Sequence, residues 1–273
     1  MQASPVWTPP GGTLGGIVAE ARQRADALGA RRAELAARLG DLPATPSFAG
    51  ALIADRVGVI AEVKRRSPSK GWINADISAV DQASAYEKGG AAAISVLTEE
   101  AHFGGSNADL LAVREAVGIP VLKKDFHVDP VQLIEARVLG ASAALLIARA
   151  LSPSDLPRLM DTAAEIGLGV LVEIRDEDEL RRALDAGATT IGINNRNLET
   201  LVIDPGTAER LLGSIPAGMV AVAESGVQSV GDVERYARAG ADAVLVGSVV
   251  SAADDPVFAV RALSTVERPG RGR

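Results

Sequence analysis

The chain has 273 residues, of which 47% are hydrophobic and 23% are charged, a composition typical of a soluble globular protein with a large core. Its net charge of −7 argues against nucleic acid as the main partner. There is no cysteine and there are only two histidines, so disulfides and thiol catalysis are excluded and a histidine-based metal cluster is implausible. No uncharged apolar stretch is long enough to span a membrane, and residues 1–12 lack the pattern of a signal peptide. We therefore expect a cytoplasmic enzyme that acts on a small molecule.

The first 55 residues do not share the pattern of the rest of the chain. Residues 1–12 are predicted to be a flexible N-terminus and residues 13–55 a helical extension. Between residues 13 and 39 the apolar positions have helical spacing, at Leu14, Val18, Leu28, Leu35 and Leu39. Packing across the domain that follows is the favoured role of this segment, and contact with a substrate is the alternative.

The first predicted strand begins the run VIAEVKRRSPSKG, residues 59–71. Glu62 and Lys64 are two residues apart at the end of this strand, so their side chains point to the same face. Burying a charged pair on so apolar a strand is costly without a partner or a ligand. The pair is therefore either a structural ion pair or part of a binding site.

Apolar runs alternate with amphipathic segments from residue 56 onward. Eight runs are predicted to be strands: 58–63, 92–97, 120–124, 143–148, 169–174, 190–194, 220–224 and 243–247. Helical spacing lies between them at 107–117, 130–139, 153–166, 177–186, 205–212 and 230–239. Asp129, Ser152 and Asp204 each precede a proline that is predicted to be the first residue of a helix. Gly-Ala pairs at 90–91, 140–141, 187–188 and 240–241 mark helix ends that a strand follows.

This alternation predicts the fold class. Near-continuous apolar strands indicate a parallel sheet that is covered on both faces. We expect an α/β protein, a single (β/α)8 TIM barrel over residues 56–265 with the N-terminal helical segment added to it. Residues 266–273 are expected to be a frayed tail. An open, doubly wound sheet is the alternative.

Polar residues gather at the carboxyl ends of the predicted strands, where such barrels carry their active sites. In chain order they are Glu62, Lys64, Thr98, Glu99, Glu100, Lys123, Lys124, Asp125, Arg149, Glu173, Asn194, Asn195, Arg196, Glu224, Ser225, Gly226, Gly247 and Ser248. The opposite strand ends are mostly Gly, Ala, Ile and Pro, so the asymmetry predicts catalysis. Lysine and glutamate without histidine favour proton transfer over a serine or cysteine nucleophile.

The strand 120–124 ends in two adjacent lysines, of which only one can point into the barrel and serve in catalysis. Lys124 points into the barrel if Leu122 does, and Lys123 then points outward, toward the surface. A lysine at the end of an apolar strand near carboxylates could act as an acid or form a Schiff base. Lys124 is therefore the candidate, and Lys123 is expected to matter little.

Phosphate has a predicted site after strands seven and eight. Gly226, Gly247 and Ser248 lie there, where barrels often bind phosphate through backbone N–H groups. A short helix expected to begin near residues 252–255 would direct its positive end at the same site.

The ordered motifs of the chain resemble the indole-3-glycerol phosphate synthase family over residues 14–262. They are VIAEVKRRSPSKG (59–71), ISVLTEE (94–100), LKKDF (122–126), LVEI (171–174), GINNRNLETL (192–201), VAESG (222–226) and VLVGS (244–248). The resemblance implies a cofactor-free and metal-free reaction of tryptophan biosynthesis. In it, 1-(2-carboxyphenylamino)-1-deoxyribulose 5-phosphate closes to indole-3-glycerol phosphate, with loss of carbon dioxide and water.

The resemblance also implies roles for individual residues. Lys124 would be the general acid of ring closure, and Glu173 a second acid or base for dehydration. Glu62 and Lys64 would form a charged pair that orients the substrate, with Asn194 and Ser225 positioning these groups. The implied substrate-binding residues are Ser67, Arg196, Glu224 and, for the phosphate, Gly226, Gly247 and Ser248. The anthranilate ring would meet a wall for which packing alone is an equal account: Phe103, Phe126, Leu145 and Leu198.

Two other functions stay open from the sequence. A related phosphate-binding barrel such as phosphoribosylanthranilate isomerase would lack the EVKRRSPSKG strand and use a cysteine, which this chain does not have. A non-catalytic barrel would be expected to have lost Glu62, Lys124 or Glu173. The expected partner is a small phosphorylated substrate, with no nucleic acid and no membrane, and other enzymes of the tryptophan pathway are candidate protein partners.

Overall fold

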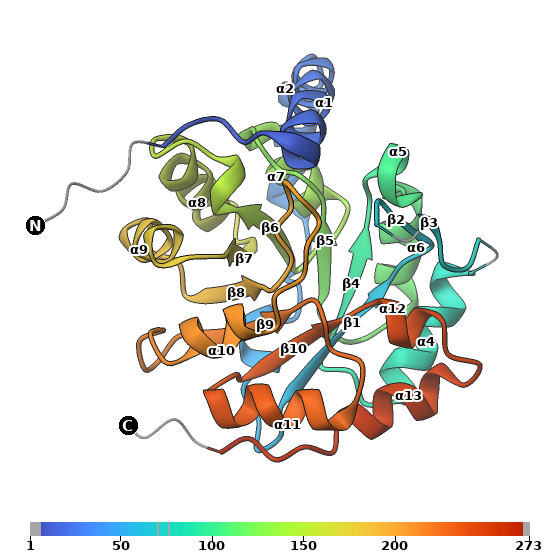
Figure 1. Ribbon diagram of the computed structural model, residues 1–273. Helices are drawn as coiled ribbons and strands as arrows, with labels where there is room; N and C mark the ends of the chain where they lie inside the picture. Colours follow the sequence, from blue (N-terminus) through green and yellow to red (C-terminus); the bar gives the residue numbers. More distant parts are fainter. Residues whose placement is uncertain (1–6, 70, 76, 270–273) are drawn as a thin grey trace, which may run out of the picture.

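The computed structural model describes residues 7–69, 71–75 and 77–269. Eight parallel strands form a closed barrel (Figure 1). They are β1 (Gly58–Val63), β4 (Ala93–Leu97), β5 (Val121–Lys124), β6 (Ala143–Ile147), β7 (Gly169–Ile174), β8 (Thr190–Asn194), β9 (Val220–Glu224) and β10 (Ala243–Val246). Pairing of β1 with β10, for example Ile60 with Leu245, closes the ring and leaves no edge. The predicted (β/α)8 barrel is confirmed, and the open sheet is excluded.

Burial explains why the strands are so apolar. All six residues of β1 are buried, as are all five of β6, because one face of each strand lines the barrel core and the other packs under helices. The helices that surround the strands are α4 (Ala79–Lys88), α6 (Asn107–Ala116), α7 (Pro130–Val138), α8 (Asp155–Glu165), α9 (Glu177–Asp185), α10 (Gly206–Leu212), α11 (Val230–Ala239) and α13 (Pro256–Leu263).

The predicted helix starts are right in one case and displaced in two. Asp129 caps α7 through a capping box with Pro130 as the first helical residue. Helix α8 begins at Asp155 rather than at residue 153, although the Ser152 hydroxyl accepts from the Asp155 N–H three residues on, as the predicted cap would. Helix α10 begins one residue after Pro205.

The N-terminal extension contains α1 (Gly12–Gly29), α2 (Arg32–Ala37), the 3-10 turn η1 (Leu39–Asp41) and α3 (Phe48–Ala51). Helices α1 and α2 lie beside α7 at one end of the barrel (Figure 1). The buried stripe of α1 includes Leu14, Ile17, Val18 and Ala21, so the helix packs on the barrel as the apolar spacing indicates. The domain boundary at residue 56 stays a prediction.

The opposite end of the barrel holds the end of the described chain. The backbones of Arg56 and Glu267 pair in an isolated antiparallel β-bridge, and the Arg268 guanidinium lies 2.8 Å from the Asp242 carboxylate. Residues 267 and 268 of the expected tail are thus hydrogen-bonded to the barrel, while residues 270–273 lie outside the described residues.

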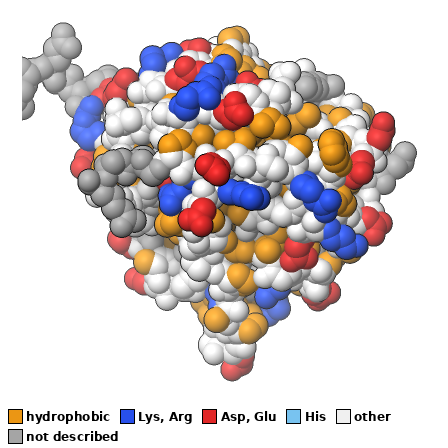
Figure 2. Space-filling view, turned by 90° about the horizontal axis from the view of Figure 1, so that it is seen from below, with side chains coloured by type: hydrophobic (Ala, Val, Ile, Leu, Met, Phe, Trp, Pro, Cys, Tyr) orange, Lys and Arg blue, Asp and Glu red, His pale blue; other side chains and the backbone are white. Residues whose placement is uncertain are grey.

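Charges of both signs are interspersed with hydrophobic side chains on the face seen in Figure 2. Among the described residues, no helix is both long and apolar enough to cross a membrane.

Candidate active site

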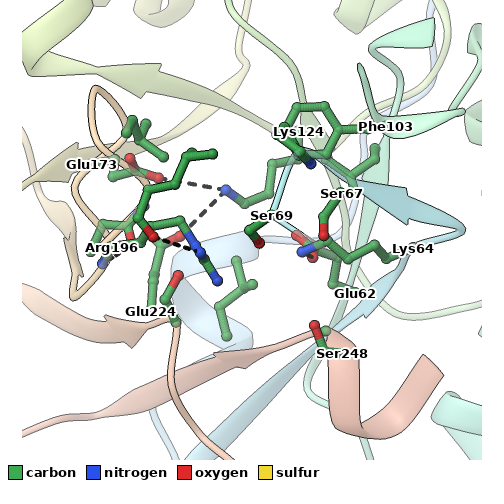
Figure 3. Close-up of a pocket in the computed structure, with 18 of the residues that line it drawn as sticks. Glu62, Lys64, Ser67, Ser69, Phe103, Lys124, Glu173, Arg196, Glu224 and Ser248 are labelled. Carbon is green, nitrogen blue, oxygen red and sulfur yellow. Dashed lines mark hydrogen bonds and ion pairs between the residues drawn. The ribbon is translucent and has the colours of Figure 1, made fainter. Parts of the chain in front are cut away.

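A cavity of about 410 Å³ opens at the carboxyl ends of the strands. Every residue to which the family resemblance gave a role lines it, from Glu62 on β1 to Ser248 after β10, and Figure 3 shows the charged side chains converging across it. The alternation of strand side chains accounts for this, because the inward positions of the strands end at the same rim. Of the other polar residues at the strand ends, Thr98, Glu99, Glu100, Lys123, Arg149 and Asn195 do not line it. The structure thus brings the predicted residues together, and their individual roles stay predictions.

Glu62 and Lys64 form an ion pair at the rim, with 2.8 Å between Nζ and Oε1. Glu62 is only 3% exposed. Burial by itself raises the pKa of this carboxyl, but the Lys64 and Lys124 ammonium groups outweigh it and lower the pKa below its usual value. Glu62 is therefore a carboxylate at neutral pH.

Lys124 lies at the centre of the carboxyl groups. Its Nζ is 3.5 Å from Glu173 Oε2 and 3.5 Å from Glu224 Oε2. Burial by itself lowers the pKa of the Lys124 ammonium, but the surrounding carboxyls outweigh it and raise that pKa. Lys124 is therefore protonated and can donate a proton or a hydrogen bond into the cavity.

Glu224 has a different environment from Glu62. It is buried, and its Oε1 has no hydrogen-bond partner. Burial, opposed by Lys124 and reinforced by Glu173 and Glu62, raises the pKa of Glu224 to about 8. Glu224 is thus more readily protonated than Glu62, a property that goes beyond the substrate-binding role predicted for it. The signal in the sequence was an inward glutamate on β9 near another on β7.

The environment of Lys123 differs from the surface position expected for it. Its side chain points out of the barrel as predicted, but it is only 2% exposed, because α7 covers it and Glu135 pairs with its Nζ at 3.1 Å. The prediction that Lys123 lies at the surface is wrong, and its small effect on activity stays a prediction. Alternation fixes the direction of a side chain, but in this fold both directions lead to buried space.

Asn194, the last residue of β8, and Asn195, directly after it, have side chains on opposite sides of the barrel wall. Asn194 lines the cavity, and its Oδ1 accepts from the Arg196 N–H at 2.9 Å. Asn195 is fully buried behind the wall, where its Nδ2 donates to the Ser225 carbonyl and to the Tyr236 hydroxyl, each at 2.9 Å. Asn195 thereby holds the Ser225 turn, whose φ of 63° is left-handed.

The predicted phosphate end of the cavity differs in one detail. The helix whose start lines the cavity is α12 (Ser248–Ser251), directly after Gly247, whereas the helix expected near residues 252–255 is α13, which begins at Pro256 away from the cavity lining. Asp255 caps α13 by accepting from the Phe258 N–H. A Cβ built on Gly247 would lie 3.2 Å from the Glu62 carboxyl carbon and closer still to Oε1. Gly247 therefore also leaves room for Glu62.

Helix α1 supplies part of the cavity wall. Thr13, Leu14 and Ile17 line the cavity, so the extension forms part of the wall besides packing on the barrel, and its contact with a substrate stays a prediction. The other apolar wall includes Phe103 and Phe126, whose ring centroids are 6.1 Å apart. The sequence could not show that α1 forms part of the wall, because a helix outside the repeating units can dock in many places.

Glu199 holds the start of α1. Its Oε1 accepts from the Gly11 N–H at 2.7 Å and from Arg149 at 2.9 Å, and its carbonyl accepts from the Thr13 N–H at 3.2 Å. Helix α1 has no side-chain cap of its own. The loops after β6 and β8, which carry Arg149 and Glu199, therefore fix the helix over the cavity.

One group of three potential metal ligands lies beside the cavity among the described residues: Glu20, Glu99 and His102. The Glu99 oxygens already accept from three backbone N–H groups of α5 (Glu100–Phe103). Arg24 lies 3.6 Å from Glu99 as well. The carboxylate oxygens of Glu99 are thus already bonded within the protein, and the arrangement gives no reason to place a cation there.

Comparisons with known proteins agree with the site. A family model described as indole-3-glycerol phosphate synthase matches residues 14–263. "Indole-3-glycerol phosphate synthase 1" of Streptomyces coelicolor is 56% identical over 210 residues, covering 77% of this chain and 78% of the relative. "Indole-3-glycerol phosphate synthase" of a Parafrankia species is 50% identical over 224 residues, covering 82% and 84%.

Solved structures show the fold alone. Thiamine phosphate pyrophosphorylase from Pyrococcus furiosus superposes with a TM-score of 0.56 at 18% identity, covering 76% of this chain and 93% of that one. A mandelate oxidase variant gives 0.57 at 18% identity, covering 78% and 76%. On the family match and the identity of these relatives, the chain belongs to the indole-3-glycerol phosphate synthase family.

Proposed function

We propose that the protein is an indole-3-glycerol phosphate synthase that works by general acid and base catalysis at the barrel mouth. Its substrate is 1-(2-carboxyphenylamino)-1-deoxyribulose 5-phosphate. The observation that carries the proposal is the protonated Lys124 between Glu173 and Glu224, across the cavity from the Glu62–Lys64 pair (Figure 3). Nothing in the fold, the site or the comparisons favours a non-catalytic barrel or a barrel of different specificity.

Ring closure needs an acid at the substrate ketone. The ring carbon that bears the carboxylate attacks the ketone carbon, and the carbonyl oxygen gains negative charge as the bond forms. Lys124 donates its proton to that oxygen. An alkoxide is a stronger base than an amine, so the transfer is favourable even from an ammonium whose pKa is raised.

The later steps restore the aromatic system. Loss of carbon dioxide leaves its bonding electrons in the ring, and the hydroxyl formed from the ketone then departs as water after gaining a proton. A proton is lost in exchange from the methylene carbon beside the nitrogen, the former C1 of the deoxyribulose, so that the double bond of the new ring forms. Glu173 is proposed as the acid or base of this dehydration, and Glu224, whose pKa is raised, is a second candidate proton donor within reach of the same space.

Binding is assigned to the rim of the cavity. The phosphate is proposed to lie against Gly226, Gly247 and Ser248, with Ser67 on the facing loop. Arg196, whose guanidinium donates to the Leu201 carbonyl at 3.0 Å, remains able to reach the substrate. The aromatic ring is proposed to rest on the apolar wall: Phe103, Phe126, Leu145, Leu198 and, from α1, Leu14 and Ile17.

A fluorescence assay tests the function. Purified protein mixed with the substrate should produce indole fluorescence and release one carbon dioxide per product. Absence of both signals, with the protein folded, would reject the proposal.

The wider setting is also proposed. The substrate is a charged phosphate ester that does not cross membranes unaided, which supports a cytoplasmic location. The enzymes that supply the substrate and consume the product are candidate protein partners, because they share these molecules. Co-purification from cells at native expression, with detection of the pathway enzymes by mass, would test that association.

A further inference from the structure

Gly192 occupies a central place in the site without contributing a side chain. It lies on β8 two residues before Asn194, so the two share the inward face of the strand. Its direct neighbours across the sheet are Glu173 on β7 and Val222 on β9. Gly192 is therefore the inward position between the two strands whose glutamates hold Lys124.

The space above Gly192 is filled by the carboxyl of Glu224. A Cβ built on Gly192 would lie 3.1 Å from the Glu224 carboxyl carbon and well within 3.0 Å of Oε1, a separation that real Cβ atoms do not show. It would also lie 3.3 Å from Leu171 Cδ1, on the other side. Any residue other than glycine must displace Glu224, because Leu171 leaves little room to move the other way.

The backbone gives no independent reason for glycine here. Gly192 is not among the glycines whose φ is positive, and a glycine inside a strand weakens the strand. Since β8 is buried along its whole length and pairs regularly with both neighbouring strands, the missing side chain has to be explained by what occupies its place. That occupant is Glu224 Oε1, the atom that has no hydrogen-bond partner.

We propose that Gly192 is a positioning residue of the ring-closing reaction: by having no side chain, it sets where Glu224 presents its carboxyl to Lys124. The inference rests on the proposed function. With Oε1 seated over Gly192, Oε2 faces Lys124 Nζ at 3.5 Å. A methyl group at residue 192 pushes the carboxyl toward the cavity and breaks this arrangement, and it also disturbs the burial that raises the pKa of Glu224. Gly247 leaves room for Glu62 in the same way, so at two places in the barrel a glycine makes space for a buried glutamate.

The first test is Gly192→Ala with Gly169→Ala as the matched control. Gly169 lies at the start of the neighbouring strand, at the far end of the barrel, and its added Cβ would meet the Ser142 carbonyl at 2.9 Å. Both variants add one methyl to a tight strand position. We expect Gly192→Ala to lower kcat at least tenfold with a smaller change in KM, and to shift the pH profile of kcat. Gly169→Ala should keep kcat within twofold of wild type.

The second test asks whether the loss passes through Glu224. Glu224→Asp withdraws the carboxyl by one methylene and frees the space over residue 192. In that background Gly192→Ala should lower kcat at least threefold less than it does in the wild type. Equal losses in both backgrounds, or wild-type kcat for Gly192→Ala alone, would overturn the proposal.

A stability measurement covers the case in which Gly192→Ala folds poorly. Glu224→Ala removes the group that clashes, so the double variant should melt at a higher temperature than Gly192→Ala alone. A double variant no more stable than Gly192→Ala would also count against the proposal. If the wild type forms no product, the proposed function fails; if it does and the two substitutions act independently, only the role of Gly192 fails.

Discussion

At the scale of single residues, Lys124 is the group on which the proposed chemistry depends most. We expect Lys124→Met to fold and to lose nearly all ring closure, because general acid catalysis typically contributes roughly 10²–10⁴-fold. Steady-state indole fluorescence measures the loss. The control is Lys88→Met at the exposed end of α4, since Lys123 is buried against Glu135 and is not a neutral site. Activity of Lys124→Met within tenfold of wild type would show that another group is the acid.

Glu173 is expected to act later in the reaction. Glu173→Gln should slow dehydration while leaving KM largely unchanged, since the amide keeps the shape of the side chain beside Lys124 but cannot exchange a proton. Rapid-quench analysis should detect a decarboxylated intermediate that has not lost water. A lower melting temperature with unchanged turnover would instead mark Glu173 as a structural partner of Lys124.

The raised pKa of Glu224 makes stability depend on pH. Because the folded-state pKa of about 8 exceeds the unfolded value near 4.5, Glu224 stabilises the folded protein fully below about pH 4.5, and this contribution is lost as the pH rises through 8. Glu179, whose pKa burial and Asp176 also raise to about 8, acts in the same window. The melting temperature of wild type should therefore fall more steeply between pH 5 and 8 than that of Glu224→Gln. Parallel curves for the two proteins would contradict this.

At the scale of elements, the contact between Glu199 and α1 joins stability to substrate binding. Glu199→Ala removes the hydrogen bond to the Gly11 N–H and the pairing with Arg149, and losing a cap costs about 1 kcal/mol. Helix α1 should then move from the cavity with Leu14 and Ile17, so we expect KM to rise several-fold with a smaller effect on kcat. Glu115→Ala, on the exposed face of α6, is the control. An unchanged KM would mean that the rest of α1 fixes its place.

Local pattern predicts the elements well where one cause dominates. The strands follow from apolar runs, and the start of α7 follows from Asp129 and Pro130, because the cap and the fixed φ of proline agree. At α8 the predicted capping bond from the Asp155 N–H to the Ser152 hydroxyl is present, but the regular helix begins only at Asp155. The site residues could be predicted because strand ends converge in a barrel, whatever the details of the loops.

The parts that sequence could not predict depend on packing between distant segments. Lys123 is outward and still buried, because a helix covers that face. The wall formed by Leu14 and Ile17 depends on where α1 docks, and the raised pKa of Glu224 depends on burial and on charges from three other strands. Each of these is a property of the assembled barrel.

At the scale of the whole molecule, the two ends of the barrel have different tasks. The carboxyl end carries the cavity, the charged residues and α1, while the amino end carries the contacts of residues 56 and 242 with 267 and 268. Substitutions at the amino end should therefore change stability more than turnover, which makes Gly169 a suitable control.

Closure of the barrel between β1 and β10 has a consequence for how the protein is made. The Ser251 hydroxyl donates to the Glu62 carbonyl at 3.0 Å across a sequence separation of 189 residues. At synthesis rates of roughly 5–20 residues per second, β1 leaves the ribosome roughly 10–40 s before β10 can pair with it. During that time one edge of an apolar strand is uncovered, which invites pairing with other chains. Refolding yield should fall as protein concentration rises, and pulsed hydrogen exchange should show the β1–β10 amides protected last; early protection there would mean that closure comes first. The native ring has no free edge, whereas the nascent chain leaves an edge of β1 unpaired until β10 has been made.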